Sequence, residues 1–119
     1  APGKITTLYR RDREMVIRVR DLLRAALPAS LSLEEVADQL HLSPRTAHRR
    51  LEEEGSSFRA IKDALRRDMA LARLTKTRDP ISQVAADLGY ADTSAFYRAF
   101  VEWTGMAPVY YRRLWSGKT

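Results

Sequence analysis

The sequence predicts an all-α fold of about seven helices, in which a long linker helix joins two helix-turn-helix units and an N-terminal helix precedes them. No stretch shows the sustained alternation of apolar and polar residues that half-buried strands need. Glycine and proline occur where helices should begin or end. An apolar pattern with helical spacing also occurs twice along the chain. Together these features exclude a sheet-based fold and indicate a duplicated helical unit.

The composition fits a small globular domain. The chain has 119 residues, of which 45% are hydrophobic and 30% charged, enough for one compact domain or two very small units sharing a helix. No run approaches the roughly 18 apolar residues of a membrane span, so no membrane partner is expected. Because cysteine is absent, disulfides and thiolate metal sites are excluded, and a cytoplasmic location is expected. The start, Ala1-Pro2-Gly3-Lys4, lacks an initiator methionine and indicates a fragment of a longer protein.

Residues 1–30 are expected to form an interdomain helix ahead of the two units. The helix should run from about Tyr9 to Ala26 and end before Pro28, because proline does not continue a helix. Apolar residues at helical spacing mark its inward face. These residues are Met15, Val19, Leu22, Leu23 and Ala26.

The first helix-turn-helix unit is expected over residues 31–56. Its first helix should begin after Ser32, because a serine followed three residues later by Glu35 forms a capping box. Ser43 and Pro44 then begin the second helix as its cap and first-turn proline. A glycine near the end of this range is a typical C-terminal stop.

A linker helix over residues 57–78 and a second unit over residues 79–115 follow. Ser57 can cap the linker helix. In the second unit, Gly89 ends the first helix and Asp92 caps the next one. The residues expected to face inward are Phe58, Ile61, Leu65, Met69 and Ala72 in the linker helix, and Phe96, Phe100 and Trp103 in the second unit.

The two units share an internal repeat. Each copy has a short helix with a small residue at its centre, a turn and a second helix, which is the helix-turn-helix layout. One extra residue, around Ala91, lengthens the second turn. The matching patterns are Leu33-x-x-Val36-Ala37-x-x-Leu40 with Ile81-x-x-Val84-Ala85-x-x-Leu88, and Ala47-x-Arg49-x-Leu51 with Phe96-x-Arg98-x-Phe100.

The second helix of each unit presents polar residues at equivalent outward positions. At about 100° per residue, the apolar residues share one side of the helix, and the polar residues lie opposite them or on the flanks. In a helix-turn-helix protein the outward face lies in the DNA major groove, where arginine fits the O6 and N7 atoms of guanine. Ordinary solvated side chains are the alternative, which the duplication weakens. The candidate base-reading residues are Arg45, His48 and Arg49 in the first unit, and Ser94, Tyr97 and Arg98 in the second.

The charge balance favours a polyanionic partner. The net charge is +6, and phosphate contacts should frame any base contacts. Asparagine is absent, so the expected code is arginine on guanine, with apolar or tyrosine contacts to thymine methyl groups. The candidate phosphate contacts are Thr46, Arg50, Thr93, Tyr111 and Arg112, with a structural salt bridge as the alternative for Arg112.

Three longer motifs extend the repeat. They are Ser43-Pro44-Arg45-Thr46-x-x-Arg49-Arg50-Leu51-x-x-x-Gly55-x-x-Phe58, Ile81-x-x-Val84-Ala85-x-x-Leu88-Gly89-Tyr90-x-Asp92-x-Ser94-x-Phe96-x-Arg98-x-Phe100, and Trp103-Thr104-Gly105-x-x-Pro108-x-x-Tyr111-Arg112. From about Leu31 to Arg113 the chain resembles the C-terminal DNA-binding domain of AraC/XylS-type transcription regulators, departing at Ala47, where related sequences usually carry a larger apolar residue. The resemblance implies two recognition helices that enter successive major grooves of a double-stranded operator or promoter. It also implies RNA polymerase as a further candidate partner, and an N-terminal effector-sensing domain missing from this chain.

Enzyme activity is not expected. The chain has two histidines, no cysteine, no nucleophile elbow and no phosphate-cradling glycine loop, so no catalytic residue, metal or cofactor is predicted. The run Glu52-Glu53-Glu54 is expected to be a solvated helix end, because consecutive helical residues point in different directions. A helical module that binds an acidic protein, and a single-stranded RNA-binding protein, are the alternative functions.

Overall fold

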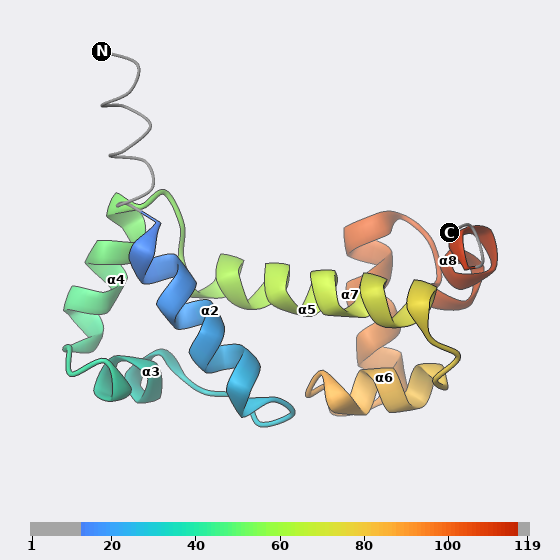
Figure 1. The fold of residues 1–119 in the computed structure, drawn as a ribbon, viewed down its shortest axis with the longest axis horizontal. Coiled ribbons are helices and arrows are strands. Elements are labelled where there is room, and N and C mark those ends of the chain that lie inside the picture. The colour runs from blue at the N-terminus through green and yellow to red at the C-terminus, as the bar shows by residue number, and fades with distance from the viewer. Residues whose placement is uncertain (1–12, 117–119) are drawn as a thin grey trace, which may run out of the picture. The chain divides into compact units, whose positions relative to one another are not determined.

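The computed structural model describes residues 13–116, and every regular element in that range is an α-helix (Figure 1). The predicted all-α class is confirmed, with seven helices in the described range. The part of the predicted first helix between Tyr9 and Asp12 lies outside the described residues. The helices are α2 (Glu14–Ala26), α3 (Leu33–Gln39), α4 (Pro44–Glu53), α5 (Phe58–Lys76), α6 (Ile81–Asp87), α7 (Thr93–Thr104) and α8 (Pro108–Trp115).

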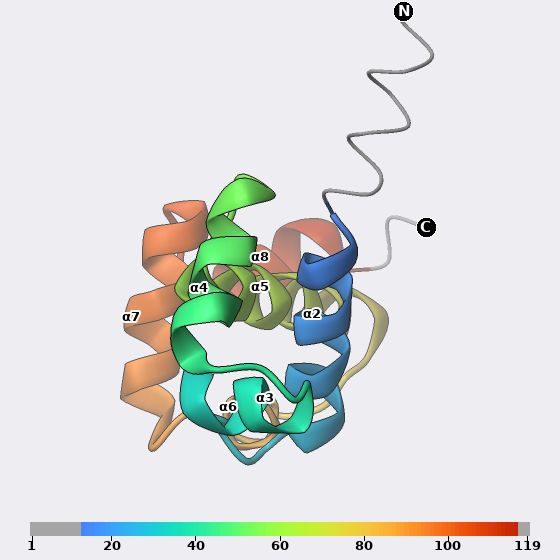
Figure 2. The same cartoon turned by 90° about the vertical axis from the view of Figure 1, so that its left-hand side faces the viewer.

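The chain folds into two compact units, each of which is larger than the helix-turn-helix that it contains, and helix α5 contributes residues to both. The first unit holds α2, α3, α4 and the start of α5 as far as Asp63. The second unit holds Leu27–Ala29 and the chain from Ala64 onward, including α6, α7 and α8. Within the first unit, α2 packs against both α3 and α4, the helices that face the viewer with it in Figure 2.

An apolar core joins the three helices of the first unit. Val36 and Ala37 of α3 pack with Ala47 and Leu51 of α4, and all four are fully buried. Close approach of α3 and α4 is possible because two of these side chains are small. The core also receives Met15, Val16, Val19 and Leu23 from α2, whereas the predicted Leu22 and Ala26 are half-buried.

Helix α3 begins at the predicted capping box. The Ser32 hydroxyl accepts a hydrogen bond from the Glu35 N–H at 3.1 Å, and the Glu35 carboxylate accepts one from the Ser32 N–H at 2.9 Å. A hydrogen bond from the Ser32 backbone lowers the pKa of Glu35, and a hydrogen bond with the Ser32 side chain lowers it further. Two backbone groups without helical partners are thereby satisfied, and the start of α3 is fixed.

Glu54 connects the end of α4 to the start of α2, a contact that the sequence analysis did not predict. Its two carboxylate oxygens accept hydrogen bonds from the backbone N–H groups of Met15, at 2.9 Å, and Val16, at 2.8 Å. These N–H groups lie in the first turn of α2, whose N–H groups have no carbonyl partner within the helix itself. The expectation of a solvated helix end is wrong for Glu54, which is half-buried, whereas Glu52 and Glu53 are exposed.

Aromatic side chains dominate the core of the second unit. Phe96 and Phe100 of α7 are fully buried, and their ring centroids lie 5.8 Å apart. Tyr90 and Trp103 pack around them as half-buried rings, with the Tyr90 centroid 5.4 Å from that of Phe96. From α5 the core receives Ala70 and Leu74, whereas the predicted Met69 and Ala72 are half-buried.

The two units turn between their helices through the same backbone hydrogen bond. In the first unit the N–H of Leu42 donates to the carbonyl of Ala37 at 2.9 Å. In the second unit the N–H of Tyr90 donates to the carbonyl of Ala85 at 3.1 Å. This bond spans five residues and closes the C-terminal end of each first helix. The repeat seen in the sequence is therefore also a repeat in backbone geometry.

One residue in each turn adopts the left-handed backbone conformation. It is His41 in the first unit, with φ of 59°, and Gly89 in the second, with φ of 87°. At Gly89 a Cβ atom would lie 2.6 Å from the carbonyl oxygen of Pro28. Both the positive φ and the close carbonyl therefore require glycine at this position.

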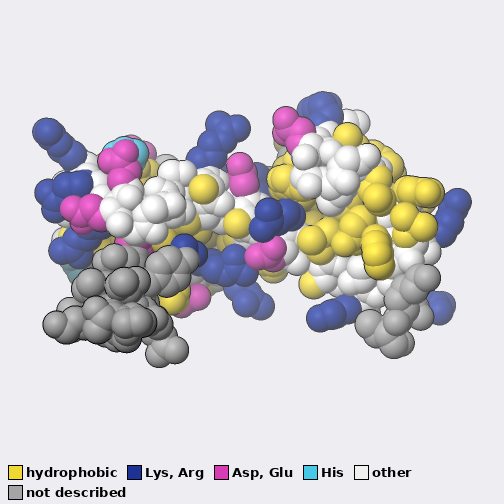
Figure 3. All heavy atoms as spheres, turned by 90° about the horizontal axis from the view of Figure 1, so that it is seen from above, with side chains coloured by type: hydrophobic (Ala, Val, Ile, Leu, Met, Phe, Trp, Pro, Cys, Tyr) yellow, Lys and Arg dark blue, Asp and Glu magenta, His cyan; other side chains and the backbone are white. Residues whose placement is uncertain are grey.

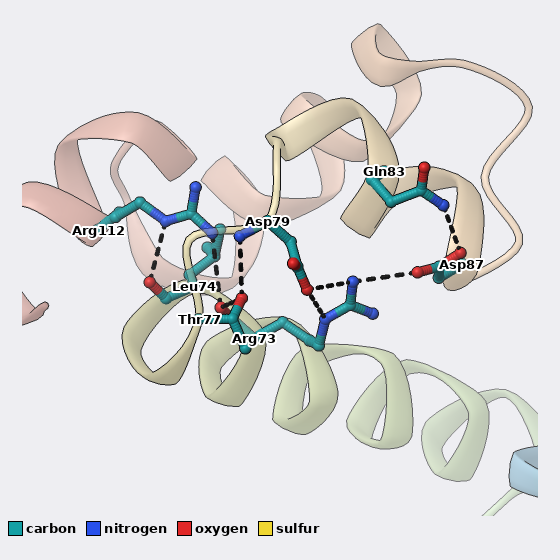
Figure 4. Close-up of polar contacts among 7 residues, drawn as sticks. All are labelled: Arg73, Leu74, Thr77, Asp79, Gln83, Asp87 and Arg112. Carbon is teal, nitrogen blue, oxygen red and sulfur yellow. Dashed lines mark hydrogen bonds and ion pairs between the residues drawn. The ribbon is translucent and has the colours of Figure 1, made fainter.

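Polar contacts tie the C-terminal end of α5 to α6 and α8 in the second unit (Figure 4). The Arg73 guanidinium donates to Asp79 at 2.8 Å and lies 3.0 Å from the Asp87 carboxylate. The Gln83 amide also donates to Asp87, at 2.8 Å. Hydrogen bonds from Gln83 and then from Arg73 lower the pKa of Asp87. The Arg73 side chain thus holds both ends of α6.

Candidate nucleic-acid interface

Helix α4 is positioned by a local cap at its start and by buried residues on one side. The Ser43 hydroxyl accepts a hydrogen bond from the Thr46 N–H at 3.1 Å, and Pro44 occupies the first turn, as predicted. Because Ala47 and Leu51 are buried, the opposite side of the helix faces outward. The three candidate base-reading residues, Arg45, His48 and Arg49, are all exposed there.

Two of these side chains pair with carboxylates one turn further along α4. His48 Nε2 lies 3.6 Å from the Glu52 carboxylate, and Arg49 Nε lies 4.0 Å from that of Glu53. All four side chains are more than half exposed. An exposed ion pair of this spacing, such as Arg49 with Glu53, contributes only about 0.3–0.5 kcal/mol. Contact with a nucleic acid could therefore displace the carboxylates at little cost.

Helix α7 is positioned in the same way. The Asp92 carboxylate accepts a hydrogen bond from the Ala95 N–H at 2.7 Å and caps the helix, as predicted. With Phe96 and Phe100 buried, Ser94 and Arg98 are exposed on the opposite side, and Tyr97 is half-buried beside them.

The outward face of α7 continues beyond the predicted residues. Val101 and Glu102 are exposed, and they line an open groove together with Tyr97 and Arg98. Neither residue was predicted from the sequence, although their spacing gave a signal. Val101 lies three residues after Arg98 and Glu102 four residues after it, which places them on the same side of a helix.

Three of the five candidate phosphate contacts lie beside the two outward faces. Arg50 is exposed on α4. The half-buried Thr46 hydroxyl accepts a hydrogen bond from the Ser43 hydroxyl at 2.9 Å. Thr93 is half-buried in the first turn of α7, where backbone N–H groups lack helical partners.

The other two candidates make contacts inside the second unit. The Tyr111 ring packs edge-on against Phe100, with centroids 5.4 Å apart. The Arg112 Nε donates to the carbonyl oxygen of Leu74 at 3.0 Å, and its Nη2 donates to that of Arg73 at 3.5 Å. Carbonyls at a helix C-terminus attract a cation because they carry the negative end of the helix dipole. Within the described residues Arg112 thus contacts carbonyls and not a carboxylate, and the phosphate role of both residues stays a prediction.

Charged and apolar side chains are distributed differently over the surface. Figure 3 shows Lys and Arg side chains on both units, and hydrophobic side chains gathered over the second.

Within residues 13–116, no group of three or more histidine or carboxylate residues could hold a metal ion. No helix in the same range is long and apolar enough to cross a membrane.

Comparison with known proteins identifies the family. A family model described as a helix-turn-helix domain matches residues 36–114, which include both turns and both outward-facing helices. The chain belongs to the AraC-type helix-turn-helix family. Members of this family are DNA-binding transcription regulators, so the chain is a DNA-binding domain and not an enzyme.

Curated AraC-type relatives are longer than this chain. The ornithine utilization regulator of Pseudomonas aeruginosa is 40% identical over 98 residues, which cover 82% of this chain and 29% of that regulator. The transcriptional regulator VirS of Mycobacterium tuberculosis is 39% identical over 102 residues, covering 85% of this chain and 30% of that protein. The chain therefore spans about 30% of the length of these relatives.

Solved AraC-type structures share the fold. The C-terminal domain of AraT, a response regulator from Geobacillus stearothermophilus, superposes with a TM-score of 0.78 at 31% identity, covering 89% of this chain and 91% of that one. The transcriptional regulator CdpR from Pseudomonas aeruginosa gives a TM-score of 0.76 at 38% identity, covering 91% of this chain and 34% of that one.

Proposed function

We propose that this domain binds duplex DNA sequence-specifically, with α4 and α7 each entering a major groove and the two grooves adjacent. One observation carries the proposal. The second helix of each helix-turn-helix unit buries one side and exposes, at equivalent positions, the sets Arg45, His48, Arg49 and Ser94, Tyr97, Arg98. An α-helix fits the major groove, where base pairs present distinct donors and acceptors.

The chemistry of these side chains suggests the bases that they read. Arg49 and Arg98 occupy equivalent positions, and each guanidinium can donate two hydrogen bonds to guanine O6 and N7. Arg45 has the same donors one turn earlier. His48 and Tyr97 occupy the second pair of equivalent positions and can contact base edges beside those guanines.

Contacts with phosphate would fix the register of the two reading helices. Arg50 and Thr46 lie next to the α4 face, and Thr93 lies at the N-terminus of α7. The Tyr111 hydroxyl and the remaining guanidinium N–H groups of Arg112 complete the proposed set. These contacts should weaken with salt, because each neutralised phosphate releases counterions.

The longer relatives suggest the setting in which the domain acts. A parent protein of similar length would carry a further domain, which we propose senses an effector and sits N-terminal to this one. The bound duplex would be an operator or promoter in the cytoplasm, and RNA polymerase would be a second partner. The family membership and the 29–30% coverage of the regulators support this setting.

Selection of binding sites from a random duplex library, followed by gel-shift titration, tests the proposal. We expect two selected sequence blocks whose centres lie about 10 base pairs apart, one helical turn. If about five phosphates are neutralised, log K should fall with log salt at a slope of about −4 to −5. Binding without any selected block, or a slope near zero, would overturn the proposal. Tighter binding to single-stranded RNA or to an acidic protein would favour the alternatives.

A further inference from the structure

We infer that Val101 of α7 is a specificity-determining residue that, with Tyr97, contacts the 5-methyl group of a thymine. The inference rests on the proposed function, because it assumes that α7 lies in a major groove. It names the apolar residue of α7 that would make the thymine contact expected from the sequence, a residue that was not among the predicted base-reading residues.

The position and exposure of Val101 are the first observation. The residue lies four positions after Tyr97 and three after Arg98, on the outward side of α7 opposite Phe96 and Phe100. Its side chain is 45% exposed. Val101 is therefore not part of the core, and it lies on the side of α7 proposed to meet DNA.

The groove around Val101 supplies a place for a small apolar group. Among the described residues, those that line it are Tyr97, Arg98, Val101 and Glu102. Two of these residues offer apolar surface, and they stand one helical turn apart, so a methyl group between them would touch both. Thymine is the base that presents a methyl group in the major groove.

The charges beside the groove indicate that base edges, and not the DNA backbone, would lie against it. In the described part of the chain, neither Arg98 nor Glu102 forms an ion pair, whereas the equivalent Arg49 and Glu53 lie 4.0 Å apart. An unpaired carboxylate is repelled by phosphate. Placing Glu102 over bases avoids that repulsion and leaves Arg98 free to bind guanine next to the thymine.

The test removes the methyl group from the DNA and the isopropyl group from the protein separately. The probe is the duplex selected by the parent domain, in which each thymine of the α7 block is replaced singly by deoxyuridine. At one position the parent should lose about fourfold in affinity, the value of one buried carbon group. Val101→Ala should bind the thymine duplex about fourfold more weakly and show a clearly smaller deoxyuridine penalty than the parent, because only Tyr97 still contacts the methyl group.

A matched control separates this contact from general effects of the substitution. Val109 on α8 is also a valine, 44% exposed, and lies outside the proposed reading faces. Val109→Ala should keep the full penalty for deoxyuridine. Thermal melting of the three proteins checks that each is folded at the assay temperature.

The outcomes distinguish this inference from the proposed function. If the parent selects no sequence, the proposed function fails and the inference fails with it. If the parent selects a site but no deoxyuridine substitution weakens binding, or Val101→Ala keeps the full penalty, the inference alone is wrong. Loss of the penalty in Val109→Ala would also overturn it, because the effect would not be local to α7.

Discussion

The two helix-turn-helix units share a backbone layout but differ in what stabilises them. In the first, α4 places the small Ala47 in the core, and α2 adds four buried residues and the Glu54 contact. In the second, Phe96 occupies the position equivalent to Ala47, and further rings pack around it. Two short helices and a turn bury too little apolar surface to be stable alone. The first copy compensates with helix α2, and the second with aromatic side chains that include Tyr111 of helix α8.

The proposed reading faces of α4 and α7 also differ in their side chains. Beyond the equivalent arginines, α4 carries Glu52 and Glu53, which pair with His48 and Arg49. Helix α7 carries Val101 and Glu102 at those positions, and Arg98 forms no ion pair in the described residues. We therefore expect α4 to rely on charge and α7 to combine charge with apolar contacts.

The largest effect is expected in the aromatic core. Phe100→Ala should lower the free energy of unfolding by about 3–5 kcal/mol, because a buried ring leaves a cavity that the core cannot close. The two tryptophans, Trp103 and Trp115, both lie in the second unit. The urea midpoint of their fluorescence should therefore fall strongly in Phe100→Ala. Circular dichroism reports the unfolding of the helices of both units together. An unchanged fluorescence midpoint would contradict the aromatic core as the main source of stability.

The reading arginines should lose discrimination without unfolding. Arg49→Ala and Arg98→Ala should each cost about 1–3 kcal/mol at one base pair, with the affected pairs about ten base pairs apart. The loss of affinity for the selected site should be slightly larger for Arg98→Ala, because Arg49 must first leave Glu53. Selected-site profiles measure this, with the exposed Arg24 of α2 changed to alanine as the control. A uniform loss across sequences would make the arginine a phosphate contact.

Removing the Glu54 contact should weaken the first unit. Glu54→Ala should cost about 1 kcal/mol, as loss of a helix cap does, because two N–H groups of α2 lose their acceptor. Glu54→Gln keeps one acceptor oxygen and should lose less. Glu53→Ala, at the exposed neighbouring position, is the control and should change little. Equal unfolding midpoints for the Glu54 and Glu53 variants would show that the contact contributes nothing.

Local signals in the sequence were sufficient for most of the fold. Caps such as Ser32 and Asp92 determine helix starts by hydrogen bonds within three residues, so they can be read directly from the chain. The exposed faces of α4 and α7 follow from the positions of their buried residues. Local patterns of this kind depend only on helix geometry.

Long-range polar contacts could not be predicted in the same way. Glu54 binds N–H groups 38 and 39 residues earlier, and nothing in a run of three glutamates distinguishes the one that turns inward. Arg112 similarly reaches the carbonyl of Leu74, 38 residues earlier. Backbone acceptors and donors leave no trace in residue type, so these partners become visible only in the folded chain.

The smallest expected effect is that of His41→Gly in the turn of the first unit. His41 and Gly89 occupy the same left-handed position in the two units, with φ of 59° and 87°. A residue with a side chain costs about 1–2 kcal/mol in this conformation, and glycine removes that cost. Glycine also makes the unfolded chain more flexible, which offsets part of the stabilisation. His41→Gly should therefore stabilise the first unit by about 0.5–1 kcal/mol, measured by urea unfolding. The reverse change, Gly89→Ala, should destabilise the second unit by more than this, since the new Cβ would also lie 2.6 Å from the Pro28 carbonyl oxygen. If His41→Gly instead lowers stability, the imidazole makes a favourable contact that outweighs its backbone strain, and the two turns are not equivalent.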